Sequence, residues 1–186
     1  MSTRYLGPTV DVHGGGLDLV FPHHEAEIAQ SENSFDVKPF VRYWMHAGMV
    51  GYGDEKMSKS LGNLVLVSDV LENYHPDALR LYLFSNHYRS SWTYDDAAIE
   101  EWAALAQDLH EAVEFPAIGM DESVDVSTLN ERFMNAMDDD LNTPEAIEAM
   151  REVAEAILEA PEEDDVRDAQ ETLREMADTL GLTLRD

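Results

Sequence analysis

The sequence of 186 residues contains no cysteine, and its only lysines are Lys38, Lys56 and Lys59. The absence of cysteine excludes disulfide bonds and argues against a small secreted scaffold. The chain also lacks an apolar run of about 18 residues, the length that a transmembrane helix needs. Residues 1–10 show no apolar segment after a basic start, so we expect no signal peptide. These absences together predict a cytoplasmic protein.

Acidic residues dominate the charge. The chain has 39 Asp and Glu against 12 Lys and Arg, which gives a net charge of -27. Carboxylates in such numbers repel one another wherever little salt screens them. Three interpretations follow: a solvated surface suited to molar salt, a disordered acidic tail, or a surface for a basic partner. The acids are spread along the chain and apolar periodicity persists between them, so the first interpretation is favoured over disorder.

The first third of the chain has an α/β pattern. The β-branched residues at 9–12 lead into the glycines at 14–16 and predict a strand that ends in a loop. Pro22 and the helix-forming residues after it predict a helix that extends to about residue 32. Residues 40–50 are aromatic and β-branched and predict a strand, whereas residues 51–63 are polar and glycine-rich and predict a loop.

The rest of the chain has the periodicity of amphipathic helices. Thr143 as N-cap and Pro144 at the first helical position predict one helix start, and Gly181 predicts a C-cap. An acidic segment at 114–127 is expected to be a linker. The helices are predicted at about residues 67–73, from Pro76 onward, and at 95–113, 128–138, 144–159 and 164–180.

Lys56, Ser58, Lys59 and Ser60 lie within five residues of one another in the glycine-flanked loop. Two ammonium groups and two hydroxyls on a loop that can close suit a polyphosphate whose charge shifts during a reaction. A solvated basic turn is the common alternative for such a segment. Because a chain with so few lysines keeps two of them here, the pattern favours phosphate chemistry.

Two further groups of residues could bind ligands. Gly14 and Gly15 allow the backbone to approach a ligand closely, and Asp18 can accept hydrogen bonds from ribose hydroxyls. A flexible turn is the alternative for this segment.

His23 and Glu27 are four residues apart, so on a helix they share one face and could bind the same zinc ion. The alternative there is an exposed helix start, where acidic side chains are favoured by the helix dipole.

These segments together resemble a known family. The loop K-M-S-K-S matches the signature loop of class I aminoacyl-tRNA synthetases. Taken in order, the segments resemble the second half of the catalytic domain of cysteinyl-tRNA synthetases, and the acidic composition is similar to that of the halophilic archaeal type. The segments that carry the resemblance are residues 11–31, Y-W-M-H-A-G-M-V at 43–50, residues 56–63, H-Y-R-S at 87–90 and residues 133–144.

The resemblance implies α/β structure followed by an all-α part. Residues 1–66 would form the C-terminal half of a Rossmann-like catalytic domain, including the K-M-S-K-S loop. Residues 67–115 would form helices that contact the tRNA stem, and residues 128–186 a truncated helical domain of the DALR type that supports tRNA. The H-I-G-H-type motif of the family lies in the first half of the catalytic domain and is missing here, so the resemblance implies a fragment.

Roles in ATP binding follow from the same resemblance. Lys59 matches a lysine that contacts ATP, and together with Lys56 it would stabilise the charge of the reacting phosphates. Ser58 and Ser60 would bind ATP in the same loop. Gly14, Gly15 and Asp18 match the region that binds the adenosine ribose.

A zinc site is also implied. His23 and Glu27 match two zinc ligands that in the family follow a pair of cysteines, and His13 and His24 match groups beside the metal. Neither cysteine is present in this sequence. The ligand set for one zinc ion is therefore incomplete, and we expect the chain alone to hold zinc weakly.

The implied activity is cysteine–tRNA ligation. L-Cysteine and ATP with magnesium would give cysteinyl-adenylate, and the cysteinyl group would pass to tRNA-Cys; the fragment alone is expected to be inactive. One alternative is a mycothiol-type ligase, which joins cysteine to an amino sugar. Another is a truncated gene product without catalysis. The acidic chain and the helical region after residue 128 favour the tRNA enzyme.

Overall fold

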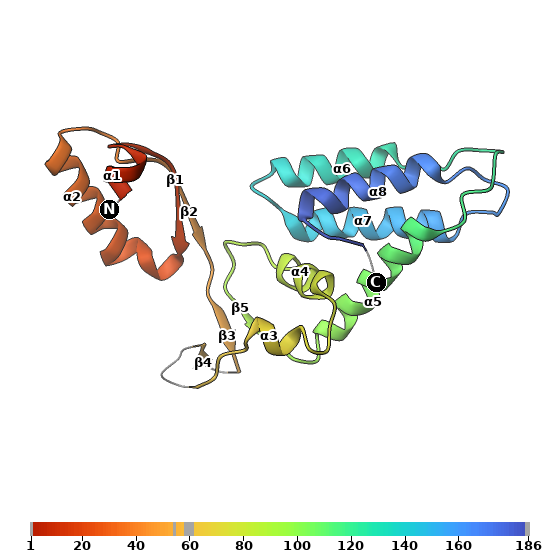
Figure 1. The fold of residues 1–186 in the computed structure, drawn as a ribbon, viewed down its shortest axis with the longest axis horizontal. Coiled ribbons are helices and arrows are strands. Elements are labelled where there is room, and N and C mark those ends of the chain that lie inside the picture. The colour runs from red at the N-terminus through yellow and green to blue at the C-terminus, as the bar shows by residue number, and fades with distance from the viewer. Residues whose placement is uncertain (1, 54, 58–61, 185–186) are drawn as a thin grey trace. The chain divides into compact units, whose positions relative to one another are not determined.

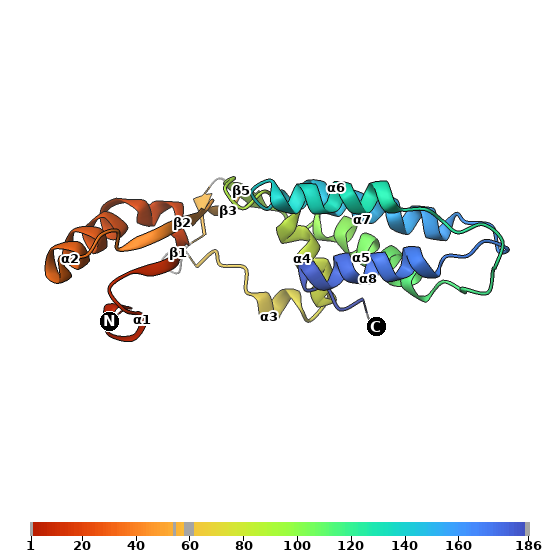
Figure 2. The same cartoon turned by 90° about the horizontal axis from the view of Figure 1, so that it is seen from above.

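The computed structural model describes residues 2–53, 55–57 and 62–184 (Figures 1 and 2). The chain divides into two compact units, one of residues 1–60 with 88–94 and the other of residues 61–87 with 95–186. The expected succession of an α/β part and a helical part is confirmed. Within the described ranges, every helix is too short or too polar to cross a membrane.

The first unit is built on a parallel strand pair. Strand β1 (Val10–Gly16) pairs with β2 (Val41–Ala47), from Val10 opposite Val41 to Gly16 opposite Ala47. Parallel neighbours need a crossover connection. Here it consists of η1 (Leu17–Leu19), η2 (Val20–His24) and helix α2 (Glu25–Phe35), and a short helix, α1 (Ser2–Leu6), precedes β1.

The predicted loop at residues 14–16 is wrong, because these glycines continue β1. They lie opposite Met45, His46 and Ala47 of β2. Pairing along the strand gives backbone amides partners that a loop would have to find in water. The predicted helix after Pro22 is present, but the regular α-helix begins at Glu25. Before it, η2 is irregular, with extended backbone angles at Phe21.

A second, smaller sheet completes this unit. Strand β3 (Val50–Tyr52) lies between β4 (Glu55–Lys56), which is antiparallel to it, and β5 (Trp92–Tyr94), which is parallel. The predicted loop at 51–63 therefore includes paired backbone. Residues 88–94 return to this unit at Gly48, whose N–H donates to the Tyr88 carbonyl over 2.7 Å. A Cβ at Gly48 would lie 2.1 Å from the Ser90 carbonyl oxygen, so this contact requires glycine.

The second unit is helical. Its helices are α3 (Val67–Val70), α4 (Pro76–Phe84), α5 (Ile99–Glu114), α6 (Ser127–Asp138), α7 (Thr143–Leu158) and α8 (Arg167–Leu180). Helices α6, α7 and α8 lie side by side (Figures 1 and 2). Together with α5 they enclose a core that is almost free of solvent contact and includes Leu105, Leu109, Phe133, Ile147, Met150, Ile157, Leu173 and Met176.

Several helix ends have defined caps or hydrogen-bond partners. Gly181 ends α8 with φ of 69°, which confirms the predicted C-cap. The predicted N-cap role of Thr143 is wrong: Asn142 precedes α7, and the Thr143 hydroxyl donates to the Phe84 carbonyl at the end of α4 over 2.7 Å. The buried Gln170 amide donates to the carbonyls of Ala112, Val113 and Phe115, so α8 satisfies the last carbonyls of α5.

Candidate functional site

One face of the β1–β2 pair carries aromatic and imidazole side chains. His13 lies opposite Trp44 and Gly15 lies opposite His46. These residues share a face because side chains alternate along a strand. The ring centroids of His13 and Trp44 are 4.9 Å apart, and the rings of Trp44 and His46 are stacked at 5.9 Å.

His24, at the end of η2, covers this face. Its ring is 4.8 Å from Trp44 and 4.9 Å from His13, centroid to centroid, and the residue is 3% exposed. His24 Nδ1 lies 2.8 Å from His46 Nε2, which is hydrogen-bond distance. Burial lowers the pKa of His24, and the nearby His13 and His46 lower it further, which favours the neutral ring.

Gly15 has no side chain, and the His24 ring occupies the space that a side chain there would fill. A Cβ at this position would approach Cε1 of His24 to 2.8 Å and Nε2 to 3.2 Å. The His24 ring also contacts the rings of Trp44 and His46, so a side chain at residue 15 would disturb these contacts. The glycine run thus has a packing role in addition to the predicted nucleotide contact, which stays a prediction.

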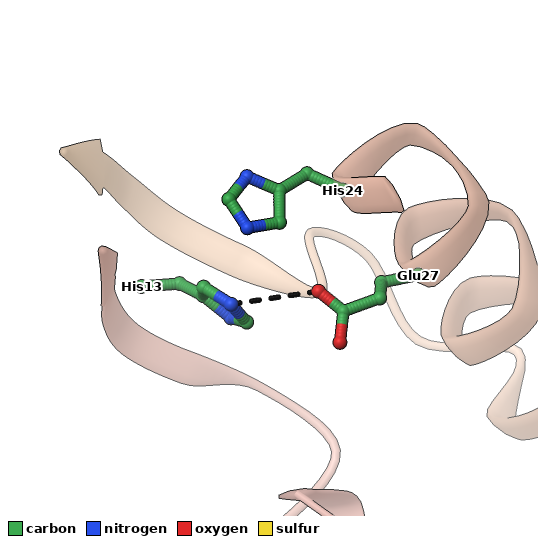
Figure 3. Close-up of side chains that lie close together, drawn as sticks. All are labelled: His13, His24 and Glu27. Atoms are coloured by element: carbon green, nitrogen blue, oxygen red, sulfur yellow. Dashed lines mark ion pairs between the residues drawn. The ribbon is translucent and has the colours of Figure 1, made fainter. Parts of the chain in front are cut away.

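Glu27, in the first turn of α2, points its carboxylate between two histidines. Its Oε2 lies 3.4 Å from His13 Nε2 (Figure 3). Its Oε1 lies 3.8 Å from His23 Nε2. Oε2 is buried, and among the described residues no group hydrogen bonds to it. His13, His24 and Glu27 each offer one metal-binding atom, and these three atoms lie within 4.8 Å of one another.

The predicted zinc ligands His23 and Glu27 lie together, and the zinc ion itself stays a prediction. Their placement follows from the i,i+4 spacing, with His23 near the end of η2 and Glu27 in the first turn of α2. An imidazole nitrogen and a carboxylate oxygen are ordinary zinc ligands, and the buried Glu27 Oε2 accepts no hydrogen bond from the described residues. The residues present therefore fit a zinc ion, with His13 and His24 as further donors beside it.

The predicted nucleotide-binding residues are placed in part. Gly14 and Gly15 lie in the carboxyl half of β1, and Asp18 follows in η1. In parallel α/β sheets, ligands bind beyond the carboxyl ends of the strands, so this location is compatible with the prediction. Lys56 belongs to β4, whereas Ser58, Lys59 and Ser60 lie outside the described residues.

Trp44 and His46 were not predicted as site residues. Their two-residue spacing in a strand indicates a shared face, but the sequence alone does not say which residues that face meets. The register with β1 and the position of η2 decide that they surround His24.

Comparison with known proteins identifies relatives over the whole chain. A protein named cysteine--tRNA ligase from Dehalococcoides mccartyi is 45% identical over 189 residues, which cover 99% of this chain and 41% of that protein. One of the same name from Hahella chejuensis is 45% identical, and one from Thermococcus gammatolerans is 39% identical, over 41% and 42% of their lengths. The chain thus spans about two-fifths of the length of these curated relatives, which include bacterial and archaeal proteins.

A solved structure shares the fold. It is described as the ternary complex of Agrobacterium radiobacter K84 agnB2 LeuRS-tRNA-LeuAMS. The match covers 92% of this chain and 25% of the chain in that structure, with a TM-score of 0.66 and 19% sequence identity. A family model described as DALR domain matches residues 132–185. The model described as tRNA synthetases class I (C) catalytic domain matches residues 1–104, more than half of the chain. The protein therefore belongs to the class I (C) tRNA synthetase family.

Proposed function

We propose that this chain supplies the C-terminal part of a cysteine–tRNA ligase. The observation that carries the proposal is the match to curated relatives of that name, at 39% to 45% identity over nearly every residue of the chain. The reaction would join L-cysteine to ATP as cysteinyl-adenylate and then pass the cysteinyl group to tRNA-Cys. The chain spans about two-fifths of those relatives, so the full reaction needs groups that this chain does not contain.

Phosphate chemistry is assigned to the K-M-S-K-S loop. Lys56 and Lys59 would stabilise the charge that develops as pyrophosphate leaves, with Ser58 and Ser60 binding ATP beside them. Gly14, Gly15 and Asp18 would bind the adenosine, at the carboxyl end of β1 where α/β sheets bind nucleotides. Magnesium would accompany ATP as part of the substrate. The protein would contribute position and charge, without a covalent nucleophile.

Zinc would be held by His23 and Glu27 together with thiolates that this sequence lacks. When bound, the ion would coordinate the thiolate of the substrate cysteine, which a serine hydroxyl cannot match. Glu27 supports this assignment, because its carboxylate faces His23 on one side and leaves a buried oxygen on the other.

The helical part would contact tRNA. Helices of residues 67–115 would face the stem, and the DALR-type region, residues 128–186, would support the rest of the molecule. The net charge of -27 suits a halophilic setting in the cytoplasm, where concentrated cations screen the repulsion between acidic protein and nucleic acid.

A complementation assay tests the proposal. The chain would be mixed with the preceding part of a curated relative, and cysteine transfer to tRNA-Cys would be measured in molar KCl. Transfer to tRNA only in the presence of both polypeptides supports the ligase. Transfer to a glucosaminyl-inositol acceptor instead would support the mycothiol-type alternative. No adenylate with either acceptor, from a folded and associated pair, would favour a truncated gene product without catalysis.

A further inference from the structure

We propose that Arg80, on the exposed side of α4, binds a backbone phosphate of the tRNA. This contact rests on the proposed function, because tRNA is taken as its partner. It goes beyond that function by assigning phosphate binding in the helical unit to one side chain of α4, and not to the arginines of α6, α7 and α8.

Most arginines of the helical unit are neutralised within the chain. In the part of this unit that the structure describes, Arg80 is the one arginine without a carboxylate partner. The paired arginines are Arg132 with Glu145 and Glu152, Arg151 with Glu148, Arg167 with Asp165, and Arg174 with Glu171. A chain with 39 acidic and 12 basic residues offers many carboxylates to each cation. A guanidinium that lacks one therefore marks a place where an external anion can bind.

The sequence of α4 explains why Arg80 is unpaired. Asp77 is the only acidic residue of this helix, and it precedes Arg80 by three positions, the spacing of a helical ion pair. Asp77 is 2% exposed, however, and its oxygens accept hydrogen bonds from the segment after α8. The exposed residues of α4 are Pro76, Arg80 and Leu83, at positions i, i+4 and i+7. This stripe carries one positive charge and no negative charge.

The end of α8 positions the guanidinium. Arg80 Nη1 lies 3.3 Å from the point that a Cβ of Gly181 would occupy. Gly181 ends α8 with φ of 69°, so the guanidinium lies beside the C-terminus of that helix. A helix C-terminus carries about half of an elementary negative charge. It can hold a guanidinium in place but cancels only part of its charge, which leaves the remainder for an anion.

The exposure of Arg80 favours a polymer over a free anion. A guanidinium can donate two parallel hydrogen bonds to one phosphate. On an open surface in molar salt, one such contact holds a single phosphate ion poorly, because screening is strong. An RNA adds contacts on either side of that phosphate. On a chain with a net charge of -27, the approach of RNA is opposed least where carboxylates are absent, as on the exposed stripe of α4.

Binding of a tRNA-Cys transcript to the 186-residue chain tests the contact. Affinity would be measured by filter binding over the range of KCl in which the chain is folded. Arg80→Gln should weaken binding about tenfold, the loss expected for a charged hydrogen-bonded contact. It should also reduce the slope of log K against log [KCl] by about 1, since one phosphate contact is removed. An unrelated tRNA should lose the same factor, because a phosphate contact reads no sequence.

Two further variants separate charge from structure. Arg80→Lys keeps the positive charge and should keep the salt slope. Arg151→Gln is the matched control, because the Arg151 guanidinium already pairs with Glu148, and it should leave affinity and slope unchanged. Circular dichroism establishes that each variant is folded, and Arg80→Met replaces Arg80→Gln if the latter is not.

Three results would overturn the assignment. Equal affinities of Arg80→Gln and the unchanged chain would reduce Arg80 to a cap of α8. Competition by inorganic phosphate would make the ligand a small anion. Absence of tRNA binding by the folded, unchanged chain would remove the contact altogether.

ATP–pyrophosphate exchange tests the proposed function separately, because adenylate formation can be followed without tRNA. It would be measured on the unchanged chain mixed with the preceding part of a curated relative. Exchange combined with an unaltered affinity of Arg80→Gln would reject Arg80 and keep the ligase. Absence of exchange combined with Arg80-dependent tRNA binding would reject the ligase and keep the phosphate contact.

Discussion

Asp77, in the first turn of α4, holds Thr183, which follows the end of α8. The Asp77 carboxylate accepts hydrogen bonds from the Thr183 N–H at 3.0 Å, from the Thr183 hydroxyl at 3.1 Å and from the Leu184 N–H at 2.9 Å. Asp77 is 2% exposed. Leu184 is held from α5 as well, where its carbonyl lies 3.0 Å from His110 Nδ1. The segment after α8 is thus fixed to two earlier helices.

We expect Asp77→Ala to lower the free energy of unfolding by about 2 kcal/mol. The substitution leaves the buried Leu184 N–H without its partner, which costs about 1–3 kcal/mol, and removes hydrogen bonds from two Thr183 donors that are only partly buried. Thr183→Val is the graded control, since it removes the hydroxyl donor and keeps both N–H donors, and it should cost about 1 kcal/mol. Urea unfolding in molar KCl measures both variants. Equal midpoints for Asp77→Ala and the unchanged chain would show that water replaces the carboxylate.

Asp165 is predicted to protonate at unusually low pH. Hydrogen bonds from the side chain and backbone of Arg167 lower its pKa to about 2, from an ordinary 3.8. Because the folded pKa lies below the unfolded one, the interaction stabilises the fold above about pH 3.8 and is lost as the pH falls toward 2. Carboxyl carbon shifts followed by NMR give the pKa directly. Arg167→Gln should raise it toward the ordinary value, and an unchanged pKa would remove Arg167 as the cause.

Much of the helical part is predictable from local signals. Apolar periodicity and the Pro144 and Gly181 signals place α6, α7 and α8 to within a few residues. The failures have tertiary causes. Thr143 carries the side chain of an N-cap, yet its hydroxyl satisfies a carbonyl of α4, which no local pattern reveals. The glycines at 14–16 read as a loop because nothing near them in sequence shows that β2 will pair with them.

The candidate site was predictable only where its residues are close in sequence. His23 and Glu27 share a helix face through their spacing alone. The approach of His13 to Glu27, and of His46 to His24, depends on strand register and on the crossover that brings η2 over the sheet. Those relationships join residues 14 and 22 positions apart, so local periodicity cannot reveal them.

Lys59 should matter for adenylate formation rather than for cysteine binding. In a chain extended to the length of the curated relatives, Lys59→Ala should slow ATP–pyrophosphate exchange strongly at saturating cysteine and leave the cysteine KM nearly unchanged. The ammonium would stabilise phosphate charge in the transition state. Its loss should therefore lower kcat without changing ground-state binding of the amino acid. Lys38→Ala is the control, because Lys38 pairs with Glu32 on the surface. A wild-type exchange rate for Lys59→Ala would exclude Lys59 from the mechanism.

High salt should be required for folding. The chain carries 39 acidic side chains and a net charge of -27, so lowering the salt lengthens the range of repulsion from about 3 Å at 1 M to about 10 Å at 0.1 M. We expect helicity and the melting temperature to rise with KCl from about 0.1 M to multimolar concentrations. Circular dichroism measures both.

An uncharged solute separates screening from general stabilisation. Sorbitol at the osmolality of molar KCl is excluded from protein surfaces but does not screen charge. If repulsion limits folding, sorbitol should restore less helicity than KCl does, and lowering the pH toward the carboxylate pKa range should partly replace salt. Equal melting temperatures at low and high KCl would contradict the prediction. The acidic surface would then be compatible with ordinary ionic strength, and the proposed halophilic setting would lose its physical support.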